Sequence, residues 1–185
     1  GTLASALCMD KDRAHKLASL AGVEVPRSVC FSGLPSQAEL ETLTRSLTFP
    51  VFVKPVRAGS SFGITKVENP ANLRTAVRDA LRYDREVIVE ETIAGFEVGC
   101  AVMGNAELTT GRADEIEIQG DLFDYTEKYN LITSKIHMPA RVDAETERRI
   151  QDTAKSIYRA LGCRGFARVD MFLEPTGRLV FNEVN

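Results

Sequence analysis

Residues 50–67, PVFVKPVRAGSSFGITKV, decide how the rest of this chain is interpreted. An apolar run ends in Lys54, a short loop follows, and a second strand-like run ends at Val67. Backbone N–H groups in a glycine-rich turn form a concave array of donors that suits phosphate oxygens, and the lysine adds a positive charge beside them. The stretch therefore predicts a hairpin that covers phosphates, with an ordinary Gly-Ser hairpin as the alternative. The small loop residues are Gly59, Ser60, Ser61 and Gly63.

The order of these residues excludes a Walker A loop, because the lysine precedes the glycines and the following residues predict a strand. A strand lysine beside a glycine-rich hairpin is the arrangement that protein kinases and ATP-grasp ligases use over ATP. Features downstream must therefore decide between an ATP site and a plain hairpin.

The composition indicates a folded protein of one or two domains. The chain has 185 residues, of which 44% are hydrophobic, and a net charge of -3, so we expect a packed core and no basic field for nucleic acid. No apolar run approaches the roughly 20 residues that cross a bilayer. Residues 1–7 lack the charged start of a signal peptide, so we expect a cytoplasmic protein, and the chain looks cut at both ends. Reduced core thiols are expected at Cys8, Cys30, Cys100 and Cys163.

Hydrophobic periodicity predicts an α+β fold with mainly antiparallel sheets and packed helices. Helices are expected at residues 10–21, 36–47 and 71–83, and a fourth begins after Asp143 and ends at Gly162. After the central hairpin, strands are expected at residues 86–91, 97–103, 108–111, 112–118, 165–173 and 178–185.

The last two strands carry the strongest chemical signal. Arg168 and Asp170 are two residues apart and share one face of the first strand, as Glu183 and Asn185 do on the second. Two carboxylates and an amide oxygen form an all-oxygen set that suits Mg²⁺ together with substrate phosphates. Surface ion pairs, Arg168 with Asp170 or Arg178 with Glu183, are the alternative, although unpaired acids are costly on buried strands.

Residues 119–134, QGDLFDYTEKYNLITS, lack clear periodicity, and loops of this length are uncommon unless they are functional. Lys128 and Tyr129 would lie over an active site if this loop were a lid; a surface loop is the alternative. Glu90 and Glu91 end a strand, where they suit contacts to ribose or adenine or are simply solvated.

Other polar residues are less informative. Glu97 suits a hydrogen bond to Ser60 or Tyr129, or exposure to solvent. Lys11 in the first turn of a helix either faces an anion or is solvated. His15 is expected on the polar face of that helix.

At this point the motifs resemble a known family, the D-alanine–D-alanine ligases, which are ATP-grasp enzymes. The overall sequence resembles most the vancomycin-resistance ligases of the VanG type, which make D-alanyl-D-serine. The matching motifs span nearly the whole chain in the order CMDK, VKPVRAGSSFGITKV, VEETIAGFEVG, FDYTEKY, GCRGFARVDMF and NEVN.

The resemblance implies a role for each candidate residue. Those implied to bind ATP are Lys11, Lys54, Ser60, Ser61, Gly63, Glu90 and Glu91. Those implied to act in catalysis are Ser60, Glu97, Lys128, Tyr129 and Arg168. Those implied to hold two Mg²⁺ ions, which Mn²⁺ can replace, are Asp170, Glu183 and Asn185.

Within that set, the resemblance implies that Glu97, Ser60 and Tyr129 form a hydrogen-bonded latch that closes the lid. Lys128 would face the γ-phosphate and the carboxylate of the second amino acid, and Arg168 would stabilise negative charge on the reacting carboxyl. The implied organisation has three parts: the start of the ATP-grasp region at 1–22, a central subdomain at 23–95 with a phosphate loop at 54–63, and a truncated C-terminal subdomain at 96–185.

The implied activity is ligation of D-Ala to D-Ser, with a housekeeping D-Ala–D-Ala ligase as the alternative and a D-lactate product not expected. A non-catalytic nucleotide-binding module is the competing class. The family suggests a homodimer that uses small-molecule substrates and neither nucleic acid nor membrane, and the isolated 185-residue chain is expected to be inactive.

Overall fold

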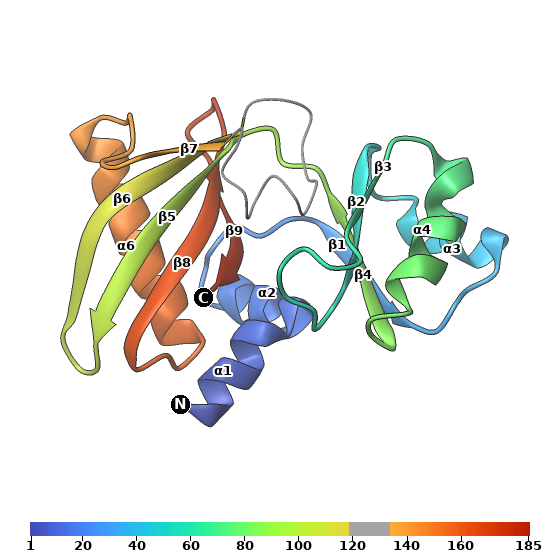
Figure 1. Cartoon of the computed structure of the whole chain (residues 1–185), viewed down its shortest axis with the longest axis horizontal. Helices are drawn as coiled ribbons and strands as arrows, with labels where there is room; N and C mark the ends of the chain where they lie inside the picture. The colour runs from blue at the N-terminus through green and yellow to red at the C-terminus, as the bar shows by residue number, and fades with distance from the viewer. Residues whose placement is uncertain (119–133) are drawn as a thin grey trace. The chain divides into compact units, whose positions relative to one another are not determined.

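The computed structural model describes residues 1–118 and 134–185 and contains two compact units (Figure 1). We call them the four-stranded unit and the five-stranded unit. The four-stranded unit comprises Met9–Asp12 and Pro26–Thr92. The five-stranded unit comprises Gly1–Cys8, Arg13–Val25 and Ile93–Asn185.

The four-stranded unit is an antiparallel sheet in the order β1-β4-β2-β3 with helices packed on one face. Strand alternation sends Val51, Val53, Val87 and Val89 into a core beneath those helices. Its strands are β1 (Ser28–Ser32), β2 (Val51–Pro55), β3 (Thr65–Val67) and β4 (Glu86–Glu91). Its helices are α3 (Gln37–Thr44), η1 (Pro70–Asn72) and α4 (Leu73–Ala80).

Local sequence explains where these helices begin. Ser36 caps α3, because its hydroxyl accepts from the backbone N–H of Glu39 while the Glu39 carboxylate accepts from Ser36. This capping box satisfies donors that the first turn would otherwise leave unpaired. Asn69 caps η1 in a similar way, and Pro70 fits the first helical position.

The five-stranded unit is an antiparallel sheet in the order β7-β6-β5-β8-β9 with α6 packed along one face (Figure 1). The Asp143 side chain caps α6 by accepting from the backbone N–H of Thr146 at 2.7 Å. The strands are β5 (Phe96–Gly104), β6 (Leu108–Ile118), β7 (Ser134–His137), β8 (Gly165–Leu173) and β9 (Leu179–Val184). The helices are α1 (Thr2–Met9), α2 (Lys11–Leu20), whose first residues belong to the four-stranded unit, and α6 (Ala144–Ala160).

Several boundaries differ from the sequence-based prediction. The strands expected at 108–111 and 112–118 are one continuous strand, β6. Its register against β5 shifts between Cys100 and Val102, so an extra residue near Gly111 is absorbed as a bulge. Helix α1 was not predicted at all. The prediction for His15 was wrong: the side chain is only 4% exposed.

No helix in the described ranges is long and apolar enough to cross a membrane.

Candidate active site

The face of the five-stranded sheet opposite α6 carries the acidic residues of the two final strands. On β8, Val169 and Met171 belong to the core under α6, so Arg168 and Asp170 lie on the opposite face. The antiparallel register pairs Asp170 with Glu183 of β9. The prediction that a hairpin brings these two carboxyl-bearing positions together is confirmed.

A bulge in β9 puts Glu183 on this face. Asp170 pairs with Glu183, but the next residue, Met171, pairs with Phe181, so Asn182 is an extra residue in the ladder. Phe181 and Val184, three apart, both lie in the core, which strict alternation would forbid. The extra residue reverses the alternation and turns Glu183 to the side of Asp170.

Asp170 is 1% exposed and is held by two neighbours. Arg168 donates from Nε to Oδ1 and from Nη2 to Oδ2, both at 2.7 Å. The Asn185 side-chain amide donates to Oδ2 at 2.8 Å. This hydrogen-bonded pair raises the pKa of the Arg168 guanidinium. The ion pair that the sequence left as an alternative is therefore present, on the same face as Glu183.

Asp114 is a further member of this face that sequence reasoning missed. In one rung of the sheet, Asp114 of β6 pairs with Gly99 of β5, and Gly99 pairs with Asp170 of β8. A Cβ on Gly99 would stand 2.3 Å from the Asp114 carboxylate, so only glycine lets this carboxylate lie across β5. The only available signal was Asp114 following the core residue Ala113 in a strand pattern.

The side-chain types in this cluster suit a divalent cation, whereas their arrangement in this structure does not. Carboxylate and amide oxygens are the donors that Mg²⁺ prefers, and Asp170, Glu183 and Asn185 supply them from adjacent positions. Both Asp170 oxygens, however, accept from Arg168 or Asn185. Among the described residues, no group of three or more His, Cys, Asp or Glu side chains is arranged to hold a metal ion.

In the four-stranded unit, the face opposite α3 and α4 presents Lys54. Its ammonium lies 2.5 Å from the Glu90 carboxylate and 5.8 Å from the centre of the Phe52 ring. The Glu90 side chain is 2% exposed and that of Lys54 is 13% exposed. Two residues expected to bind ATP, one at phosphate and one at adenosine, are thus an ion pair in this structure.

The loop after β2 has an unusual backbone. Ser60, Ser61 and Gly63 adopt left-handed φ values of 53°, 58° and 71°. Such values cost of order 1 kcal/mol for a non-glycine residue and are concentrated at functional sites. Phe62 stacks on Tyr83 with ring centres 6.3 Å apart, which ties the loop to the chain after α4.

The start of α2 and the phosphate-loop candidate are joined within the four-stranded unit. Lys11 donates from its backbone N–H to the carbonyl of Val56 at 3.2 Å and from its ammonium to that of Ala58 at 2.8 Å. Arg57 bonds to Asp10 and Asp84 and also to Glu86. The carboxylates of Asp84 and Glu86 raise the pKa of the Arg57 guanidinium. Sequence reasoning missed Arg57 because its partners lie far apart in the chain.

The remaining candidate site residues are Glu91, Glu97, Lys128 and Tyr129. Glu91 accepts from the backbone and guanidinium of Arg27 at 2.9 and 2.7 Å. Glu97 lies on β5 and is 4% exposed. Lys128 and Tyr129 lie outside the described residues.

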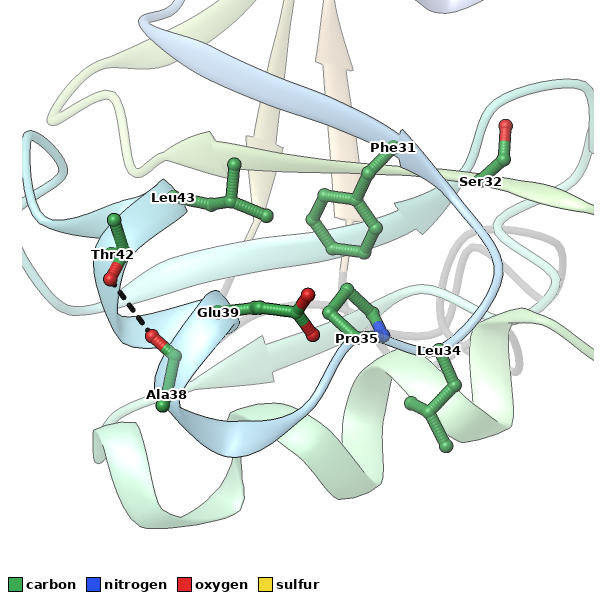
Figure 2. A pocket seen from close by; sticks show the side chains of 8 residues that line it. All are labelled: Phe31, Ser32, Leu34, Pro35, Ala38, Glu39, Thr42 and Leu43. Carbon is green, nitrogen blue, oxygen red and sulfur yellow. Dashed lines mark hydrogen bonds between the residues drawn. The ribbon is translucent and has the colours of Figure 1, made fainter.

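A hollow of about 660 Å³ beside α3 does not resemble an active site (Figure 2). Apolar side chains dominate its wall. Its one carboxylate, Glu39, is bound in the cap of α3. The lining residues are Phe31, Ser32, Leu34, Pro35, Ala38, Glu39, Thr42 and Leu43.

Comparison with known proteins identifies the fold. The crystal structure of the VanG D-Ala:D-Ser ligase from Enterococcus faecalis is 63% identical, covers 100% of this chain and 54% of its own length, and superposes with a TM-score of 0.91. The vancomycin B-type resistance protein VanB from Enterococcus faecalis is 44% identical over 98% of this chain and 53% of its own length. The D-alanine–D-alanine ligase from Chlorobium luteolum is 43% identical over 100% of this chain and 53% of its own length.

This chain thus spans about half the length of the curated relatives it matches. Its two antiparallel sheets with packed helices have the ATP-grasp fold of these ligases, as predicted. The family described as "D-ala D-ala ligase C-terminus" matches residues 21–185, and the chain belongs to that family.

Proposed function

We propose that the protein containing this chain is an ATP-dependent ligase that joins D-Ala to D-Ser through an acyl phosphate. The observation that carries the ligase class is the cluster of Arg168, Asp170 and Glu183 on one face of a family-member fold. The 63% identity to a protein whose title names D-Ala and D-Ser supports the choice of D-Ser. The dipeptide would form the terminus of a peptidoglycan precursor.

The four-stranded unit supplies groups suited to ATP. The left-handed backbone at Ser60, Ser61 and Gly63 supports a role of this loop in covering phosphates. Lys54 and Lys11 are cations beside the same loop, and on binding ATP the Lys54 ammonium would exchange its contact with Glu90 for one with a phosphate oxygen. Glu90 and Glu91 would then serve the adenosine.

The five-stranded unit supplies groups suited to charge that develops during transfer. Asp170, Glu183 and Asn185 would hold divalent cations, Mg²⁺ or Mn²⁺, which neutralise phosphate charge when bound. Arg168 is kept protonated by Asp170 and would face the reacting carboxyl group. We also propose catalytic roles for Glu97, Ser60, Lys128 and Tyr129, as the resemblance implies.

In this mechanism, the D-Ala carboxylate attacks the γ-phosphorus of ATP, and ADP leaves. The amine of D-Ser attacks the acyl carbon, a tetrahedral oxyanion forms, and its collapse expels phosphate, which takes up the proton that the amine loses. Arg168 would stabilise the oxyanion, a contribution that typically amounts to 10²–10³-fold in rate for one such donor. Exclusion of water protects the acyl phosphate from hydrolysis.

Phosphate release by the full-length protein tests the proposal. The assay contains ATP, Mg²⁺ and D-Ala, with D-Ser, further D-Ala or D-lactate as the second substrate, and mass spectrometry identifies the product. D-alanyl-D-serine as the preferred product is the expected result. Preference for D-Ala would establish the housekeeping alternative, which the Chlorobium relative supports. No phosphate release with any pair would favour a non-catalytic nucleotide-binding module.

We further propose that the full-length protein is a cytoplasmic homodimer acting on small molecules. Light scattering of the purified full-length protein measures the dimer directly, and a monomeric mass would contradict it.

A further inference from the structure

His15 is a buried histidine on α2 that the ligase chemistry above does not use. Its side chain packs edge-on against Phe181, with ring centres 5.3 Å apart and an interplanar angle of 73°. Its Nε2 lies 2.8 Å from the backbone carbonyl oxygen of Asn182. Because a carbonyl oxygen only accepts hydrogen bonds, Nε2 must carry the proton and donate.

The partner of this hydrogen bond is the bulge residue of β9. Asn182 is the residue without a partner in the β8–β9 register, and a bulge leaves the ladder locally disrupted. His15 therefore supplies a donor to a carbonyl at the point where the sheet ladder is interrupted. The same ring packs on Phe181, the core residue on the other side of the bulge.

This contact bears on the acidic face, because the bulge decides which way Glu183 points. If β9 alternated regularly, without a bulge at Asn182, Glu183 would share the face of Phe181, two positions earlier, and point into the core. With the bulge, Glu183 pairs with Asp170 on the face opposite α6, and Asn185 reaches the Asp170 carboxylate.

We infer that His15 is a positioning residue that holds the Asn182 bulge and thereby aims Glu183 at a divalent cation shared with Asp170. The inference rests on the proposed function, since it assigns the purpose of the bulge to that cation site. It adds a residue from α2, far from Glu183 in sequence, to the support of the cation ligands. Residues that orient metal ligands typically change metal affinity by 10–100-fold when they are lost.

The competing explanation is that His15 only fills space in the core. Two substitutions of similar shape separate these roles. His15→Gln keeps a side-chain N–H at about the reach of Nε2, whereas His15→Met fills the same volume without a donor. Both are good helix formers, so neither should disturb α2 through backbone propensity.

The experiment measures binding of Mn²⁺ alone to the full-length protein by electron paramagnetic resonance. We expect His15→Met to weaken Mn²⁺ binding about 10-fold and His15→Gln to remain within about twofold of the wild type. Steady-state kinetics should show His15→Met lowering kcat, with the KM for D-Ala unchanged. Ser19→Ala, on the exposed side of α2, is the matched control and should change neither quantity.

Thermal melts accompany each measurement. Wild-type Mn²⁺ affinity in His15→Met, whatever its melting temperature, would overturn the inference, as would equal weakening in His15→Met and His15→Gln. Glu183→Gln separates this failure from failure of the cation site itself. If Glu183→Gln leaves Mn²⁺ binding unchanged, the proposed cation assignment is wrong and the inference falls with it. If Glu183→Gln weakens binding and His15→Met does not, only the role of His15 is wrong.

Discussion

Asp170 and Glu183 face each other across the β8–β9 pair, although Glu183 is two residues from the core residue Phe181. The bulge at Asn182 reconciles these two facts by reversing the alternation of β9. The pairing of two carboxyl groups on adjacent buried strands is costly without a compensating charge, and Arg168 supplies one such charge at 2.7 Å.

The first prediction concerns this pair of acids. Asp170→Asn removes the charge that Arg168 neutralises, and Glu183→Gln removes a proposed cation ligand. Each should lower kcat of the full-length enzyme by about 100-fold or more, as expected for loss of charge stabilisation in the transition state. Glu107→Gln in the exposed β5–β6 turn is the control. Activity within threefold of the wild type in either variant would contradict the assigned roles.

The second prediction concerns the Lys54–Glu90 ion pair. Lys54→Met leaves the buried Glu90 carboxylate without the ammonium that lies 2.5 Å away. Removing one partner of such a pair should lower the free energy of unfolding by about 3 kcal/mol. The double variant Lys54→Met/Glu90→Gln should be more stable than Lys54→Met alone, because the remaining amide is neutral. Urea denaturation of the wild type, the two single variants and the double variant measures the coupling between the two residues. Strictly additive changes in the free energy of unfolding would show that they are not coupled.

The third prediction concerns two cysteines that the sequence places far apart. The sulfur atoms of Cys8 and Cys163 lie 3.7 Å apart, and a hydrogen bond from the Cys8 thiol lowers the pKa of Cys163 to about 7. Cys163 also lines an open hollow of about 750 Å³, which gives reagents access. Alkylation of Cys163 by iodoacetamide, followed by peptide mass spectrometry, should therefore reach half of its maximal rate near pH 7.

Cys8→Ala provides the comparison for this profile. Loss of the donor should move the midpoint for Cys163 towards the usual thiol value of 9.0. A midpoint that is the same with and without Cys8 would show that the neighbouring thiol does not stabilise the thiolate. Cys30→Ala, a substitution in the other unit, should leave the profile unchanged.

The fourth prediction is the pH dependence of stability from Glu115. The hydrogen bond from Arg141 lowers the pKa of Glu115 below its usual value of 4.5. A carboxyl group with a depressed pKa stabilises the folded state above its unfolded pKa, and this contribution disappears as pH falls through the folded pKa. The difference in the free energy of unfolding between the wild type and Glu115→Gln should thus be largest near pH 7 and shrink below pH 4.5. Urea denaturation at several pH values measures it, and a difference independent of pH would contradict this assignment.

Local patterns determined much of this protein from the sequence alone. The alternation in β8 correctly put Arg168 and Asp170 on one face, and capping by Asp143 correctly located the start of α6. These predictions succeeded because side-chain direction in a strand and donor satisfaction at a helix start depend on near neighbours.

Tertiary structure alone decided the contacts between distant segments. The bulge at Asn182 and the burial of His15 against it require β8, β9 and α2 to pack together. The sequence pattern within any one of these elements does not predict that packing. The Cys8–Cys163 contact and the partners of Arg57 have the same origin. Side-chain periodicity describes one element at a time, whereas a register shift or an ion-pair network is set by the free energy of elements packing against one another.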